Sequence, residues 1–396
     1  MVKRSTVIEQ LKKELERLAG QGRQRQFHIV NSRAPGVIEL GGKRFVDFSN
    51  WDALNLHTHP KVRRTLQEEI ERFGVATASN RLASGTFQPH ISAENRIAKF
   101  VGTESALLFS SRTQALLSLV TALCSERDLI CFDELCQAPV SDAAYLTNTP
   151  AQPFTVADLS SLEEPLAKAR EGTRKFIFVE AFSPVSGRKV DLTALSELSR
   201  HHDAKVILDS SCSLGLSGAR GAGVLEAAKV EDLPFVQLAD LSTGLGGFGA
   251  FLASDRITIS YLVQKSRNLR LESPLPPALA SAIEVGLDHA ELQTAQRACI
   301  QRHAERVRNA LRTMKATVYD SSDCPFVCLQ LSSLRTSFEL QEFLLTRGMY
   351  AENVPRGTLF DQGAVLRLIF NSEHSERQIE DLVVALSESV PKTFSA

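Results

Sequence analysis

The sequence carries almost no net charge, because 45 lysines and arginines are balanced by 46 aspartates and glutamates, for a formal charge of -1. Proteins that bind nucleic acids generally need a basic surface, so this balance argues against a nucleic-acid partner. A long hydrophobic run is also missing, since no apolar stretch approaches the roughly 20 residues of a membrane-spanning helix. The first residues, Met-Val-Lys-Arg, lead into a charged stretch instead of the apolar core of a signal peptide. We therefore expect a cytoplasmic protein without a transmembrane segment.

Cysteine pairs of the kind that hold metals or form disulfides are missing as well. The seven cysteines are odd in number, and no two have the Cys-x-x-Cys spacing of a zinc site. We expect no metal and no disulfide, and we expect most thiols to be reduced and buried. The sequence does contain 43% hydrophobic and 23% charged residues over 396 positions, which is typical of a soluble globular protein with room for two domains.

Short apolar runs alternate with longer amphipathic stretches from about residue 100 onward. The runs cover residues 106–109, 129–132, 176–179, 206–208, 236–238 and 250–252. Such alternation is typical of βαβ units around a buried, mainly parallel sheet. A proline-rich stretch at 274–277 then precedes a long helical stretch, roughly 278–314, and several shorter elements. We predict an α/β fold with an N-terminal helix and extended arm at 1–45, a large domain at 46–277 and a small α+β domain at 278–396.

An amphipathic helix is predicted near the N-terminus, at residues 5–19. Its apolar side chains recur at helical spacing among charged residues: Val7, Ile8, Leu11, Leu15 and Leu18. We expect this face to dock on the chain's own body or on a twin subunit. Binding to a membrane surface is the weaker alternative, because acidic residues interrupt the polar face.

Acidic residues end several of the predicted strands. Asp133, Glu180 and Asp209 each follow an apolar run directly. Open α/β sheets bind their ligands at the carboxyl ends of the strands. The sequence therefore places the candidate site along this edge of the sheet.

Five segments occur in an order and at separations that are specific when taken together. They are residues 85–90 (Gly-Thr-Phe-Gln-Pro-His), 93–100 (Ala-Glu-Asn-Arg-Ile-Ala-Lys-Phe), 102–109 (Gly-Thr-Glu-Ser-Ala-Leu-Leu-Phe), a glycine-rich block at 208–223, and 275–277 (Leu-Pro-Pro). This series resembles the α-oxoamine synthase family, the fold-type I, pyridoxal-phosphate-dependent enzymes that condense an amino acid with an acyl-CoA. The resemblance implies a large domain with a mainly parallel sheet of seven-stranded type, flanked by helices, and a smaller α+β domain.

The resemblance also implies pyridoxal phosphate as cofactor, which works with a lysine Schiff base and an acid beside its pyridine nitrogen. Asp209 matches that acid, although a buried carboxylate that caps a neighbouring helix or loop is the structural alternative. The lysine is missing. Residues 239–247 read Ala-Asp-Leu-Ser-Thr-Gly-Leu-Gly-Gly, which puts Thr243, after Ser242, where the family has its lysine. A threonine hydroxyl cannot form an imine, so we predict no covalent bond between this chain and the cofactor.

Other cofactor-binding positions depart from the family pattern too. Gln137 replaces the residue that stacks on the pyridine ring, and Cys212 replaces the histidine that contacts the ring oxygen. Ser111 and Arg112 stand in the segment that cradles the phosphate. Arg112 could bind a phosphate or an acyl-CoA, or it could fill the vacated site with charge and close the pocket. For Cys212 we prefer a buried thiol to a nucleophile, because no His–carboxylate pair is evident nearby.

Family dimers build each active site from both protomers, and several positions match residues that face the partner or the substrate. They are Asn80, Arg81, Gly85, Thr86, His90 and Ser273. Arg367 matches the arginine that grips the substrate carboxylate, which suits a bidentate guanidinium. The alternative is an ordinary arginine at a strand end, paired with Glu373 or Asp361.

The combined losses resemble the lysine-lacking subunit of serine palmitoyltransferase, the long-chain-base subunit 1 type. Our first hypothesis is a degenerate α-oxoamine synthase-like subunit of a homodimer or heterodimer, which supports a lysine-bearing homologue that acts on an amino acid and an acyl-CoA. The second is an active acyltransferase or aminotransferase-like enzyme that holds the cofactor non-covalently. The third is a homodimeric, non-enzymatic protein that binds a ligand or acyl-CoA.

Overall fold

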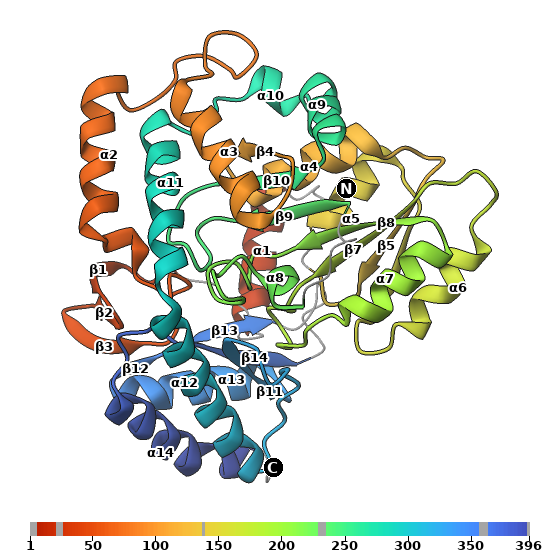
Figure 1. Ribbon diagram of the computed structural model, residues 1–396. Coiled ribbons are helices and arrows are strands. Elements are labelled where there is room, and N and C mark those ends of the chain that lie inside the picture. The colour runs from red at the N-terminus through yellow and green to blue at the C-terminus, as the bar shows by residue number, and fades with distance from the viewer. Residues whose placement is uncertain (1–5, 21–26, 137–138, 229–234, 356–362, 394–396) are drawn as a thin grey trace.

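The computed structural model describes residues 6–20, 27–136, 139–228, 235–355 and 363–393, and the structural statements below concern these residues. A seven-stranded sheet in the order β4-β10-β9-β8-β7-β5-β6 forms its centre (Figure 1). The strands are β4 (Ser105–Phe109), β5 (Leu129–Asp133), β6 (Ala151–Phe154), β7 (Lys175–Glu180), β8 (Ala204–Asp209), β9 (Val236–Asp240) and β10 (Ala250–Ser254). β10 is antiparallel to both of its neighbours, and the other pairs are parallel. The predicted α/β fold with a mainly parallel sheet is therefore confirmed.

The sheet is buried on both faces, which explains why its strands read as unbroken apolar runs. On β7, Phe176 and Phe178 lie in one apolar cluster, whereas Ile177 and Val179 lie in another. Successive side chains of a strand point to opposite faces. A strand covered on both sides therefore needs apolar residues at every position.

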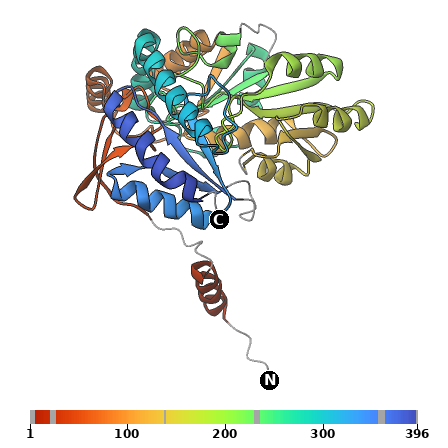
Figure 2. The ribbon, with the colours of Figure 1, turned by 90° about the horizontal axis from the view of Figure 1, so that it is seen from below.

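Helices surround this sheet in both views (Figures 1 and 2). The helical elements between residues 56 and 271 are η1 (Leu56–Thr58), α2 (Pro60–Phe73), α3 (Gln88–Val101), α4 (Arg112–Leu123), α5 (Pro139–Thr147), α6 (Ser160–Lys168), α7 (Leu192–His201), α8 (Val224–Ala228), α9 (Arg256–Lys265) and α10 (Asn268–Leu271). Several begin at a side-chain cap. Ser111 accepts a hydrogen bond from the N–H of Gln114, and Asp255 accepts one from the N–H of Thr258. Such caps pair N–H groups that the start of a helix leaves without partners.

The long helix expected at 278–314 is two helices, α11 (Pro277–Leu292) and α12 (Thr294–Thr313), with a break at Gln293. The break contains neither proline nor glycine, so the local sequence does not predict it. Arg297 stabilises it, because its guanidinium donates to the carbonyl of Ala290 at 2.6 Å, in the last turn of α11. Carbonyls at a helix end otherwise lack partners within the helix.

The C-terminal part carries a three-stranded sheet in the order β11-β14-β13, formed by β11 (Phe326–Leu331), β13 (Glu352–Pro355) and β14 (Ala364–Ile369). α12 packs against β11 and against α14 (Glu376–Thr393), and α13 (Leu334–Thr346) contacts all three strands. A four-stranded sheet joins β1 (Val30–Ala34), β2 (Val37–Leu40) and β3 (Lys43–Asp47) to β12 (Met349–Tyr350). The N-terminal arm is thus tied to the C-terminal part of the chain.

The N-terminal helix α1 (Val7–Gly20) forms as predicted, and Figure 2 shows it standing clear of the body. Its apolar face is exposed: Val7 is 69% accessible and Leu11 55%. This face therefore does not dock on the chain's own body in the structure. Across the described ranges, no helix is both long and apolar enough to cross a membrane.

Candidate functional site

Four neighbouring parallel strands end in an acidic residue at the same edge of the large sheet. They are β5, β7, β8 and β9, which end in Asp133, Glu180, Asp209 and Asp240. Glu180 and Asp209 are directly opposite each other across β7 and β8, and both are buried. Burial raises the pKa of Asp133 to about 6 and the pKa of Glu180 to about 8, because charged carboxylates lose their hydration there. The edge predicted to bind a ligand therefore carries a surplus of buried acid.

Arg112 opposes this acid. It is the first residue of α4, and its Nε donates to Asp209 while its Nη2 donates to Glu180 Oε1 at 3.0 Å. Burial disfavours the charge on Arg112, but the two carboxylates outweigh it and raise the pKa of the guanidinium. The guanidinium therefore pairs with two of the four acidic strand ends.

Both carboxylate oxygens of Asp209 accept hydrogen bonds. Its Oδ1 accepts hydrogen bonds from the N–H of Ser211 at 2.9 Å and from Ser211 Oγ at 2.5 Å, and its Oδ2 accepts from Arg112. Ser211 in turn accepts a hydrogen bond at its Oγ from the N–H of Asp240, which links the ends of β8 and β9. The carboxylate is thus held from both sides by side chains of this chain.

Thr243 lies half-buried in the loop between β9 and β10. The next residue, Gly244, has φ +76°, and a Cβ added there would lie 2.1 Å from the carbonyl oxygen of Leu214. Gly215, also at positive φ, approaches the carbonyl of Gly244 in the same way. The two loops therefore pack backbone against backbone, and only glycine fits at the contact. Ser242 is exposed, and its N–H donates to Asp240 at 2.7 Å.

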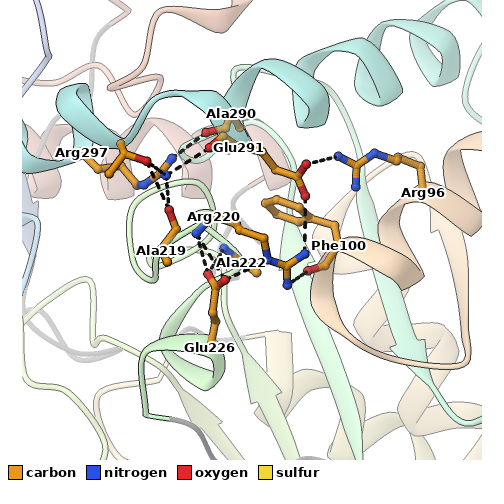
Figure 3. Close-up of polar contacts among 10 residues, drawn as sticks. Arg96, Phe100, Ala219, Arg220, Ala222, Glu226, Ala290, Glu291 and Arg297 are labelled. Atoms are coloured by element: carbon orange, nitrogen blue, oxygen red, sulfur yellow. Dashed lines mark hydrogen bonds and ion pairs between the residues drawn. The ribbon is translucent and has the colours of Figure 1, made fainter.

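Side chains that do not line the cavity, namely those of Arg297 and Glu226, contact the glycine-rich loop after β8 (Figure 3). Arg297 donates to the carbonyl of Ala219 at 2.5 Å, in addition to its bond to Ala290. Arg220 pairs with Glu226 at 2.9 Å. The bonds of Arg297 hold the loop against the break between α11 and α12, and the Arg220–Glu226 pair ties the same loop to α8.

Arg367 on β14 lies near the acidic strand ends and comes from the C-terminal part of the chain. Its guanidinium stacks on the ring of Trp51, 4.7 Å from the centroid. It donates to the carbonyl of Pro184 at 2.9 Å and pairs with Glu352 at 2.6 Å. The sequence had suggested Glu373 or Asp361 as its structural partner. The partner is Glu352 on the neighbouring strand β13, and Asp361 lies outside the described residues.

The remaining cofactor candidates differ in burial and in their contacts. Cys212 is a free, buried thiol, and burial raises its pKa, so it is a poor nucleophile. Ser111 caps α4. Ser273 is exposed, and its carbonyl accepts from Ser110 Oγ at 3.3 Å. Gln137 lies outside the described residues.

The residues matched to partner-facing positions shape one segment, 79–90. Arg81 makes a bidentate ion pair with Glu94 at 2.8 and 3.0 Å and also donates to Thr86 Oγ1. His90 is fully buried, and its ring accepts from the N–H of Phe87 and contacts the carbonyl of Leu275 at 2.6 Å. The side chain of Asn80 caps the turn that follows it. Within a single chain, these side chains hold the segment in shape.

A cavity of about 140 Å³ lies at the acidic edge. Its lining residues are Trp51, Arg112, Glu180, Phe182, Pro184, Asp209, Ser211, Cys212, Asp240, Thr243 and Arg367. The cavity thus brings together five of the predicted site residues, namely Arg112, Asp209, Cys212, Thr243 and Arg367. Trp51 and Asp240 were not among the site residues predicted from the sequence. Asp240 could have been found, because it follows an apolar run just as Asp209 does.

Comparison with known proteins assigns this scaffold. The family model described as aminotransferase class I and II matches residues 44–386. The chain belongs to this family. It is 30% identical to the 8-amino-7-oxononanoate synthase of Methylococcus capsulatus, over 92% of this chain and 94% of that protein. The corresponding synthase of Geobacter sulfurreducens is 28% identical, over 94% and 96%.

Solved structures agree on the fold. Serine palmitoyltransferase of Sphingomonas wittichii superposes with a TM-score of 0.91 at 22% identity, covering 99% of this chain and 100% of that one. These names and the matched family model confirm the resemblance to α-oxoamine synthases. Membership implies the cofactor of the family, pyridoxal phosphate.

The residues described at this site do not fit that cofactor in three respects. No lysine is among the cavity-lining residues, all of which lie in the described ranges. Asp209, which would face the pyridine nitrogen, is occupied by Arg112. The cavity of about 140 Å³ is also smaller than the roughly 300–1,000 Å³ of usual ligand pockets.

Proposed function

We propose that this chain is a catalytically degenerate α-oxoamine synthase-like subunit that supports a lysine-bearing homologue. The observation that carries the proposal is the bridge from Arg112 to Asp209 and Glu180, at the place where the cofactor ring would need a free acid. Thr243 supports it, since a hydroxyl cannot take the role of the Schiff-base amine. The chemistry of the family would then take place in the partner's site.

The charge bridge makes cofactor binding in this chain costly. A cofactor ring placed against Asp209 would have to displace Arg112 from two buried carboxylates. Removing one partner from a buried ion pair costs about 3–5 kcal/mol, because the remaining charge is left without compensation. The absent lysine and the occupied acid act together against binding.

An apolar, exposed rim supports the idea of a protein partner. Leu82 is 46% exposed and Leu271 82%. Leu82 follows Arg81 and Leu271 precedes Glu272, and both Arg81 and Glu272 line one small hollow together with Ser273. Large apolar side chains gathered at one place on a surface are typical of interaction sites. We propose that this rim contacts the partner subunit, as the matched family positions suggest.

The test is capture of the partner together with a cofactor assay. The tagged full-length chain should retain a lysine-bearing homologue, identified by mass spectrometry, and the pair should condense an amino acid with an acyl-CoA. The chain alone, mixed with pyridoxal phosphate, should give no absorbance band of a lysine-bound cofactor. Such a band, trapped by borohydride at a lysine of this chain, would refute the proposal.

An active enzyme is the second candidate, because the named relatives are synthases. In that case the isolated chain would turn over an amino acid and an acyl-CoA with cofactor held non-covalently. Turnover that persists after Arg112 is replaced, but is lost on replacing Asp209, would favour this candidate over the degenerate subunit.

A further inference from the structure

We propose that the cavity at the acidic strand ends is a binding site for a small organic cation of the primary ammonium class. This goes beyond the proposed function, because it concerns a ligand of the isolated chain and needs no partner subunit. The cavity has the right size for such a ligand: about 140 Å³ is close to the roughly 150 Å³ of a protein cavity that holds benzene.

The charges around the cavity favour a cation. Three carboxylates line it, those of Glu180, Asp209 and Asp240. Arg112 is shared between Glu180 and Asp209, and the charge of Arg367 is balanced by Glu352, which does not line the cavity. Where Glu180 is ionised, the lining therefore carries three negative and two positive charges, which opposes an anion such as a phosphate.

Glu180 supplies the second observation, because it has an unused acceptor. Its Oε1 accepts from Arg112, but its Oε2 is buried and has no hydrogen-bond partner among the residues that the structure describes. The side chain is only 6% exposed. Buried carboxylate oxygens are normally paired, so this atom calls for a donor from the cavity when the carboxyl is ionised. Burial, with too little compensation, raises the pKa of Glu180 to about 8.

A primary ammonium group fits these surroundings better than a metal ion does. It carries three N–H donors, as the lysine head does, and can reach acceptors that lie apart. Over the described ranges, no three His, Cys, Asp or Glu side chains are grouped so as to hold a metal. Trp51 and Phe182 add apolar walls that suit a short alkyl chain.

The experiment uses the purified full-length chain and methylammonium chloride as the probe, with sodium chloride at the same ionic strength as the reference. Saturable binding, by calorimetry and by a rise in Tm, is expected for methylammonium only. Its affinity should increase about tenfold between pH 7 and pH 9, because the ionised fraction of a carboxyl with a pKa of about 8 increases by that factor. The titratable and charged groups that interact electrostatically with Glu180, and so bear on its pKa, are Arg112, Asp133, Cys136, Asp209, Cys212 and Arg367.

Glu180→Gln is the decisive variant. A glutamine can still accept from Arg112, so the bridge keeps its shape while the cavity loses a charge. Methylammonium should bind at least about tenfold more weakly, and the pH dependence should disappear. Glu164→Gln is the matched control, since Glu164 is exposed on α6 and pairs with Lys168. The control variant should bind methylammonium with the affinity of the parent protein.

Two results would overturn the assignment: equal responses to methylammonium and sodium at pH 9, or unchanged affinity in Glu180→Gln. If that variant does not fold, Asp240→Asn, at a half-buried position, replaces it with the same expectation of weaker binding. This outcome is separate from the test of the proposed function. A lysine-bound cofactor band would refute the proposed function, whereas the presence or absence of ammonium binding would not.

Discussion

Replacing Arg112 by methionine tests the charge bridge most directly. The methionine keeps an unbranched apolar stem in the space, but Asp209 and Glu180 lose the guanidinium that pairs with both of them. The three side chains are well buried, with 13%, 2% and 6% of their surfaces exposed. Removing one partner from a buried ion pair destabilises a protein by about 3–5 kcal/mol, and we expect a loss of that size at pH 7.

The loss should depend on pH with a definite sign. The pKa of Glu180 is raised from its ordinary 4.5 to about 8 in the folded chain, chiefly by burial. Between these values the folded state binds more protons than the unfolded state, so this group makes the protein less stable as pH rises. Without Arg112, which lowers this pKa, the decline should extend to higher pH. The variant should therefore be closest to the parent at pH 5 and furthest from it at pH 9.

Urea denaturation at pH 5, 7 and 9 measures both effects. The fluorescence of Trp51 is a suitable probe, because it is the single tryptophan and lies beneath Arg367 beside the cavity. Arg112→Lys should fall between parent and methionine, since an ammonium keeps the charge without the forked geometry. Arg335→Met, at an exposed pair, is the control and should change nothing measurable. A methionine variant as stable as the parent at pH 9 would refute the reasoning.

Three further predictions concern other parts of the chain. Thr243→Lys alone should give no absorbance band of a lysine-bound cofactor, because Arg112 still holds the acid; a band in the single variant would contradict this. Gly244→Ala should cost more stability in urea than Gly41→Ala, since both have positive φ but only at Gly244 would the new Cβ meet a carbonyl, at 2.1 Å; equal losses would show that the loop contact is unimportant. Burial lowers the pKa of His374 from 6.5 to about 4, so the folded state should lose up to about 3 kcal/mol as pH falls through this interval. The His374→Asn variant should lose less free energy of unfolding than the parent protein over the same pH range, as urea titration of both proteins would measure.

The fold was largely accessible from the sequence, because its dominant signal is local. Runs such as 176–179 are apolar at every position, as a strand buried on both faces requires, and each forms a strand of the large sheet. The break at Gln293 was not accessible. It depends on Arg297, whose guanidinium ties α11 to Ala219, 78 residues earlier in the chain, and such a contact leaves no mark in the local pattern.

The site was accessible only in part, for a related reason. Asp209 and Thr243 follow from motifs that are contiguous in sequence. The partners that decide the chemistry come from strand order: Glu180 is beside Asp209 because β7 is beside β8, and Glu352 pairs with Arg367 because β13 is beside β14. The sequence indicated that Arg112 was out of place in a phosphate cradle, but it could not say which acids the guanidinium would meet.

The site also separates what holds the scaffold from what performs the chemistry. The glycines of both loops are required by backbone contacts alone, since a Cβ at Gly215 or Gly244 would collide with the opposite loop whatever stood at position 243. Their retention therefore says nothing about catalysis. Arg112 and Thr243 differ from these glycines, because they line the cavity with their side chains and neither has a positive φ. The family match over residues 44–386 accordingly assigns the scaffold, whereas the test of cofactor binding lies in variants of these two side chains.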